Sequence, residues 1–185
     1  MLEANENYQK QSWRNRCNIL TANGVEALQV PVVHKDGTFR HPIREIEVDY
    51  SRDWLTRQKR AIDSAYMSSA YFEYYRDALY AVLDSRPDTL WNLDLAVLDF
   101  FLAAYGRPGA GRKDGDGRVP VGFTENFLGA SLDIHPKRED SVWNALLKDG
   151  TSAMGKPYFQ VFSQKYGFVP NLSIMDYLFN EGPVL

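Results

Sequence analysis

The chain has 185 residues, of which 44% are hydrophobic and 24% charged, and its formal net charge is −3 at pH 7. These values are those of one globular domain over residues 1–185, so they exclude a disordered chain and argue against a nucleic-acid partner. No apolar run is long enough to span a membrane, the first residues lack a secretory signal pattern, and the single Cys17 has no disulfide partner, so we expect a cytoplasmic protein without membrane insertion.

The N-terminal third of the chain has the pattern of β-strands. Residues 16–21 and 25–33 are rich in apolar and β-branched side chains, and the turn signal Ala22-Asn23-Gly24 separates them. An Asn-Gly pair between two such runs is typical of a hairpin with a type I′ turn, in which both central residues have positive φ. We therefore expect an antiparallel hairpin with this turn.

A further strand is predicted at residues 43–50, where apolar and acidic side chains alternate. Ile46, Val48 and Tyr50 fall on one face of such a strand, and the acidic side chains fall on the other. This alternation is typical of a strand with one side on the core and the other in water.

Helical periodicity dominates the middle of the chain, over residues 53–67 and 70–83, and residues 89–105 are apolar on nearly all sides. We expect this third helix to be the central buried one, and its carboxylates Asp94 and Asp99 to need Arg or backbone donors as partners. Strands come first and helices follow. This order predicts an α+β fold in which N-terminal antiparallel strands pack against the mainly helical C-terminal two-thirds.

A closing helix is predicted to begin after Ser173. The spacing between Ser173 and Asp176 is that of a capping box, with Ser173 as the N-cap residue and Asp176 at the third helical position. In such a box each side chain binds a backbone N–H of the other residue.

The densest polar cluster of the chain lies at residues 7–16. If this segment is a strand, one face carries three cations and a hydroxyl group, from Lys10, Ser12, Arg14 and Arg16. The fixed donor fork of arginine suits an anion such as a diphosphate. The alternative is a solvated edge strand whose cations pair with carboxylates of the protein itself.

A second candidate cluster consists of His135, Lys137 and Arg138. The neighbouring cations disfavour the protonated imidazole, which suits His135 to acid–base catalysis near pH 7. The alternative is a loop that docks onto the protein through these polar side chains.

Metal and cysteine chemistry have weaker signals. His34, His41 and His135 lack the spacing of metal ligands, so neither a metal nor another cofactor is expected. Cys17 could act as a nucleophile beside one of the histidines. The alternative is that Cys17 is a small core residue on a buried strand.

Several short motifs are spread along the chain in a fixed order. They occupy residues 7–17, 28–32, 71–75, 134–138 and 167–176, together with Trp54 and the pair Ala65-Tyr66. In these motifs and in their order the chain resembles the WbqC-like proteins over nearly its whole length.

The chain departs from the family pattern in two places. Members usually carry an additional stretch with a strand before the motif at residues 7–17. Either the start of this sequence is misplaced or the strand is missing, and in the second case an exposed strand edge and a homo-oligomer are expected. Many members also carry a His shortly after the tryptophan that corresponds to Trp54. Gln58 and Lys59 stand there in this chain, so we assign no general base at that place.

The resemblance implies a role in the biosynthesis of bacterial surface polysaccharide, including O antigen. We expect the chain to act on a nucleotide- or lipid-linked sugar, by an acyl- or aminoacyl-type transfer. The alternative is a non-catalytic binding or scaffold protein of the same pathway, with an exposed apolar patch instead of a pocket. If the chain acts on such a sugar, its phosphate would be held by Lys10, Arg14 and Arg16, with Asn15 beside them. The sugar would be flanked by His135, Lys137 and Arg138. A ring of the ligand would stack on Trp13 and Trp54.

Overall fold

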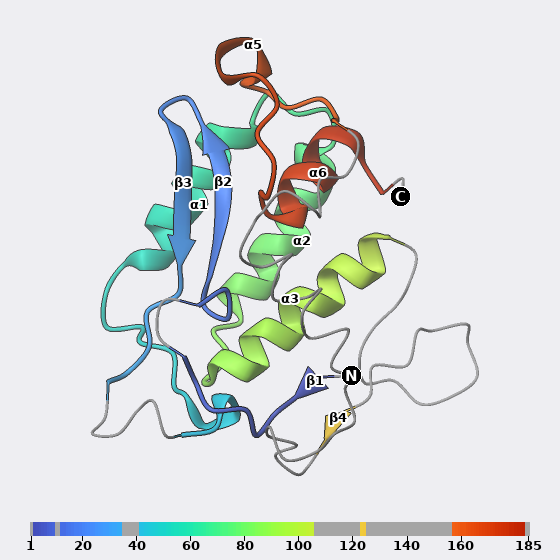
Figure 1. The fold of residues 1–185 in the computed structure, drawn as a ribbon. Helices are drawn as coiled ribbons and strands as arrows, with labels where there is room; N and C mark the ends of the chain where they lie inside the picture. Colours follow the sequence, from blue (N-terminus) through green and yellow to red (C-terminus); the bar gives the residue numbers. More distant parts are fainter. Residues whose placement is uncertain (1, 10–11, 35–40, 106–122, 125–156, 184–185) are drawn as a thin grey trace, which may run out of the picture.

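The fold is known from a computed structural model, which describes residues 2–9, 12–34, 41–105, 123–124 and 157–183. An N-terminal hairpin packs against a set of helices, so the predicted α+β class is confirmed (Figure 1). The elements in chain order are β1 (Leu2–Glu3), β2 (Arg16–Thr21), β3 (Gly24–Gln29), the 3₁₀ turn η2 (Ile43–Glu45), α1 (Trp54–Tyr66), α2 (Phe72–Asp84), α3 (Leu90–Ala104), β4 (Phe123–Thr124), α5 (Ser163–Tyr166) and α6 (Ile174–Glu181).

The predicted hairpin forms, but its turn is not of type I′. β2 and β3 pair antiparallel, with Thr21 opposite Gly24, so that Ala22 and Asn23 make the two-residue connection. Positive φ occurs at Gly24 (105°) and at neither connecting residue, whereas a type I′ turn needs it at both. The Thr21 hydroxyl closes the turn instead, because it accepts from the Asn23 N–H at 3.2 Å and donates to the Gly24 carbonyl at 2.9 Å.

The strand predicted at residues 43–50 is only partly correct. Ile46 and Val48 are buried as expected, but the segment opens with η2 and then makes single bridges, one of them between Val32 and Val48. The Asp49 N–H donates to the Pro31 carbonyl at 2.9 Å. Pro31 has no N–H to return this bond, so a regular ladder cannot continue past that pair.

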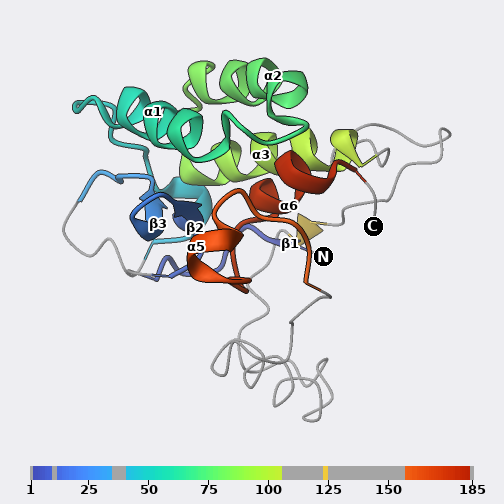
Figure 2. The same ribbon diagram turned by 90° about the horizontal axis from the view of Figure 1, so that it is seen from above.

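The helices α1, α2 and α3 lie together on one side of the hairpin (Figure 2). α1 packs on β2, α2 packs on α3, and α6 packs against α1 and α2. The expectation that the third helix is buried all round is wrong, because α3 buries Leu90 and Leu93 while its other apolar side chains are half-buried or, at Ala103, exposed. Part of this helix faces a cavity rather than packed side chains.

An aromatic cluster fixes α6 to the other helices. The Phe179 ring meets the rings of Tyr66 and Phe72 edge to face, with centroids 5.1 Å apart in both pairs. All three side chains are at most 1% exposed. Each such side chain contributes roughly 1.5–3 kcal/mol through burial, and each ring pair adds about 0.5–1.5 kcal/mol.

Only one of the two contacts of the capping box predicted for α6 forms. The Ser173 hydroxyl caps the helix by accepting from the Met175 N–H at 3.3 Å. The Asp176 side chain does not reach back to Ser173 but points into the core, where it is 1% exposed.

Asp176 instead anchors the segment that precedes α5. Its Oδ2 accepts from the Tyr158 hydroxyl at 2.7 Å and from the Gln160 amide at 3.2 Å. The Gln160 amide also pairs with both backbone groups of Val169, at 2.8 and 2.9 Å. Burial raises the pKa of Asp176 even though these hydrogen bonds act in the opposite direction. The buried amide therefore joins residues 157–170 to α6.

Candidate functional site

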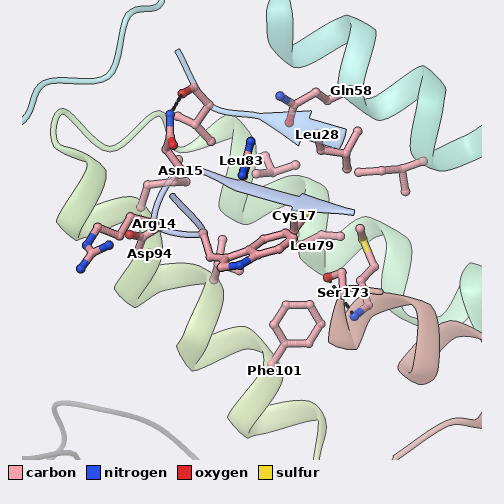
Figure 3. A pocket seen from close by; sticks show the side chains of 17 residues that line it. Arg14, Asn15, Cys17, Leu28, Gln58, Leu79, Leu83, Asp94, Phe101 and Ser173 are labelled. Atoms are coloured by element: carbon pink, nitrogen blue, oxygen red, sulfur yellow. Dashed lines mark hydrogen bonds between the residues drawn. The ribbon is translucent and has the colours of Figure 1, made fainter. Parts of the chain in front are cut away.

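A pocket lies between the hairpin and the helices, with a volume of about 240 Å³ (Figure 3). Its floor is apolar and comes from β3, α1, α2, α3 and the start of α6. The apolar lining consists of Leu28, Val30, Ile62, Leu79, Leu83, Leu93, Val97, Phe101 and Met175, and the remaining lining residues are Trp13, Arg14, Asn15, Arg16, Cys17, Gln58, Asp94 and Ser173.

The segment before β2 is a turn rather than the strand that was expected. Residues 12–15 are bent, and the Ser12 hydroxyl donates to the Gln9 carbonyl at 2.7 Å. Because of this turn, alternate side chains do not share one face as they would on a strand. Arg14 and Arg16 nevertheless both line the pocket, whereas Lys10 lies outside the described residues.

Arg14 is paired with a carboxylate of the protein. Its guanidinium holds both carboxylate oxygens of Glu6, through Nη2 and through Nε, the latter at 3.1 Å. Both side chains are partly buried, and the bidentate geometry suits arginine. The alternative of an intramolecular ion pair is therefore confirmed for Arg14, whose charge is largely matched before any ligand binds.

Arg16 differs from Arg14 because it forms no ion pair with any of the described residues. Its guanidinium carbon lies 5.3 Å from the centre of the Trp13 ring, in a cation–π contact. The Nε atom is buried and has no hydrogen-bond partner. Trp13 is 54% exposed. The wall of the pocket thus carries a cation stacked on an accessible indole, with its charge unmatched within the described part of the chain.

Asn15 holds the start of β2 against the end of β3. Its side-chain NH₂ donates to the Val30 carbonyl at 3.0 Å, and its backbone carbonyl accepts from the Val30 N–H at 2.8 Å. The residue is 3% exposed. Asn15 lines the pocket, and it also fixes the backbone between Arg14 and Arg16; its predicted role in substrate binding stays a prediction.

Asp94 carries a carboxyl group into the pocket from α3. Burial raises its pKa to about 7. The sequence predicted that Asp94 would find an Arg or a backbone donor, but none of the described residues makes a hydrogen bond or ion pair with it that the structure records. The signal that marks this residue is a carboxylate in an otherwise apolar helix.

Cys17 lies in the same pocket, half-buried on β2. Burial raises the pKa of the thiol, and a hydrogen bond with the Ser173 side chain opposes this effect only in part. A raised pKa leaves less thiolate at neutral pH, so Cys17 is poorly suited to act as a nucleophile.

We expect the folded protein to react with a disulfide reagent such as Ellman's reagent at pH 7 at least roughly tenfold more slowly than the urea-unfolded chain does. The measurement is unambiguous because the chain has one cysteine. Equal rates in the folded and unfolded states would show that the thiol is accessible and ordinarily acidic.

The remaining residues expected at the site are Trp54 and the cluster of His135, Lys137 and Arg138. Trp54 is a core residue that is 4% exposed, with its indole N–H bonded to the Asp49 carbonyl at 2.9 Å and its ring stacked on Tyr50. It does not line this pocket, although its neighbour on α1, Gln58, does. The predicted cluster of His135, Lys137 and Arg138 lies outside the described residues.

The described residues hold neither a metal-ligand cluster nor a membrane-spanning helix. Within these ranges, no group of three or more His, Cys, Asp or Glu side chains is arranged to hold a metal ion. Among the described helices, none is both long enough and apolar enough to cross a bilayer.

The chain is similar to the uncharacterized protein Rv1507c of Mycobacterium tuberculosis, with 28% identity over 187 aligned positions that cover 95% of this chain and 80% of that protein. No solved structure matches the chain. The model of the WbqC-like protein family matches residues 1–106, which include the hairpin, the first three helices and both Arg16 and Asp94. The chain therefore belongs to the WbqC-like protein family.

Proposed function

We propose that this protein binds a phosphorylated glycan precursor, a nucleotide- or lipid-linked sugar, in the pocket between the hairpin and α3. The setting we propose is the cytoplasmic stage of bacterial surface-polysaccharide biosynthesis, including that of O antigen. The resemblance to the family suggests this setting, and the pocket suggests the kind of ligand. One observation carries the proposal, namely the Arg16 guanidinium stacked on Trp13 in the pocket wall, with no carboxylate partner among the described residues.

The phosphate is assigned to Arg16 for electrostatic reasons. A guanidinium offers parallel N–H donors that match two phosphate oxygens, and it binds them more strongly when its charge is not already matched. Arg14 is held by Glu6, so it contributes less to binding an anion. The exposed Trp13 ring also offers a flat surface on which a base or a sugar can stack.

The apolar floor supports an acyl- or aminoacyl-type transfer as the form of the reaction. A sugar carries a hydroxyl group on most of its carbons, and these groups lose hydrogen bonds when an apolar surface covers them. We therefore place the sugar phosphate at the polar wall and an apolar group, such as an acyl chain, on the floor formed in part by Leu79, Leu93 and Phe101.

Replacement of Arg16 by glutamine is expected to weaken binding of a nucleotide sugar by roughly tenfold to a hundredfold, because a hydrogen bond to a charged group contributes about 1.5–3 kcal/mol. Thermal-shift measurements with UDP-glucose, dTDP-glucose and GDP-mannose show which nucleotide sugar binds, and calorimetry then gives the affinity for that compound. The matched control is Arg60→Gln, an exposed arginine of α1 that does not line the pocket. Binding that is unchanged in Arg16→Gln contradicts the proposal.

A second candidate function is a non-catalytic binding or scaffold role in the same pathway. It is favoured by exposed apolar side chains where α1 passes into α2: Met67 is 70% exposed, Tyr71 40% and Tyr74 79%. Exposed apolar groups of this kind are typical of contact surfaces, including those of homo-oligomers. The two candidates predict different effects of substitution. In the first, a change at Arg16 weakens function, and in the second, a change at this exposed surface does.

A further inference from the structure

Asp94 is the one acidic side chain among the described residues that line the pocket. Val97 and Phe101 follow it at spacings of three and seven, so the three residues share the face of α3 that is turned towards the cavity (Figure 3). The carboxyl group is therefore set into an apolar surface and opens onto the space where a ligand would lie.

The cations of the pocket do not serve as its partners. Arg14 is held by Glu6, and Arg16 stacks on Trp13. The raised pKa of Asp94 has burial as its cause, with no opposing contribution from either guanidinium. A carboxylate in an apolar setting is costly unless a cation or several donors reach it. Within the described part of the protein this requirement is unmet, and a cationic group of a bound ligand would meet it.

We infer that the pocket takes a ligand with an amino group and that Asp94 binds this group as an ammonium ion. An ammonium supplies both the opposite charge and up to three N–H donors, whereas a sugar hydroxyl supplies one donor and no charge. The inference rests on the proposed function and names its substrate class, which is an amino sugar with its phosphate at Arg16 and its amine at Asp94.

The carboxyl group is also suited to exchange a proton with an amine. The pKa of the Asp94 carboxyl is about 7, which is closer to the pKa of an ammonium group than the pKa of an exposed Asp is. A proton therefore moves between this carboxyl and an amine at a smaller cost in free energy. Bound ammonium favours the ionised carboxylate and lowers this pKa. Binding at pH 7 should therefore release protons. The other titratable lining groups are Arg14, Arg16 and Cys17, and they face the ligand from the N-terminal segment and β2.

The inference is tested with benzylamine and benzyl alcohol, which share one apolar body and differ in the ammonium group. Calorimetry at pH 7 in two buffers of different ionisation enthalpy gives both the affinity and the number of protons released. We expect benzylamine to bind at least tenfold more tightly than benzyl alcohol, with release of protons. In Asp94→Asn the two affinities should agree within about twofold. Asp99→Asn is the matched control on the same helix and should keep the preference for the amine.

A measurement on the wild-type protein keeps the test independent of any variant. The pH titration of the Asp94 carboxyl ¹³C signal should shift to lower pH when benzylamine is present and stay in place with benzyl alcohol. Equal affinities for the two probes, an unshifted titration, or an amine preference that survives in Asp94→Asn each overturn the inference. Because these probes carry no phosphate, Arg16→Gln should not affect them. Failure here is thus separate from failure of nucleotide-sugar binding, which would overturn the proposed function.

Discussion

The Asp94→Asn variant is expected to be more stable than the wild type by roughly 2–4 kcal/mol at pH 8 and by less than half of that at pH 5. Asparagine keeps the shape of the side chain and removes the group that burial penalises when it is charged. The pKa of the Asp94 carboxyl is about 7 in the folded protein, against an ordinary value of 3.8. The effect is large because the carboxyl group has no partner among the described residues.

The direction of the pH dependence follows from this raised pKa. Below about pH 4 the Asp94 carboxyl is protonated in both the folded and the unfolded wild type. Its burial therefore does not lower the free energy of unfolding, and the wild type and Asp94→Asn do not differ in stability at this site. Between pH 4 and pH 7 the unfolded chain loses the proton first, and the stability of the folded wild type falls until the pH exceeds about 7. The Asp94→Asn variant does not lose stability in this way because its amide does not titrate.

Urea unfolding of both proteins at pH 5 and pH 8 measures the difference. The control is Glu26→Gln, which neutralises an exposed carboxylate on β3 and should change the free energy of unfolding by less than about 0.5 kcal/mol. A variant that is no more stable than the wild type at pH 8 would mean that Asp94 has a partner after all.

Replacement of Phe179 by alanine is expected to lower the free energy of unfolding by about 3–5 kcal/mol. The ring is fully buried and contacts Tyr66 and Phe72 edge to face, so its removal leaves a cavity that these rigid neighbours cannot close. α6 also carries Ser173 and Met175 to the pocket, and loosening this helix should accelerate labelling of the pocket thiol.

The control for this prediction lies on the same helix. Ile174 is 45% exposed, so Ile174→Ala removes a comparable apolar side chain without opening a cavity, and it should change the stability by less than about 1 kcal/mol. Similar losses in both variants would indicate that α6 contributes through its helical propensity and not through the packing of Phe179.

The helices could be predicted closely from the sequence because their signal is local. The spacing of apolar residues places α1, α2 and α3 within one or two residues of their observed ends. The cap at Ser173 was predicted for the same reason. The turn type at Ala22-Asn23 was not, because the hydroxyl of Thr21 outweighs the preference of the Asn-Gly pair.

The site could be predicted only in part because it depends on contacts between distant segments. A cationic segment beside Trp13 is visible in the sequence. The pairing of Arg14 with Glu6 and the stacking of Arg16 on Trp13, with no ion pair among the described residues, depend on a turn that no periodicity indicates. Asp94 stands out in the sequence, like Asp99, as a charge in a mainly apolar helix. Its place in one pocket with Arg16 and Cys17 follows from the packing of α3 against the rest of the fold, which the spacing of residues along one helix cannot give.

The central claim is that Arg16 holds the phosphate of a glycan precursor, and NMR of the arginine side chains tests it most directly. In ¹⁵N-labelled protein the Arg16 Nε–Hε signal, assigned by its loss in Arg16→Gln, is followed while the nucleotide sugar with the largest thermal shift is added. A saturating shift of this signal with the Arg60 signal unmoved is the predicted result. An Arg16 signal that stays in place while the ligand binds contradicts the claim.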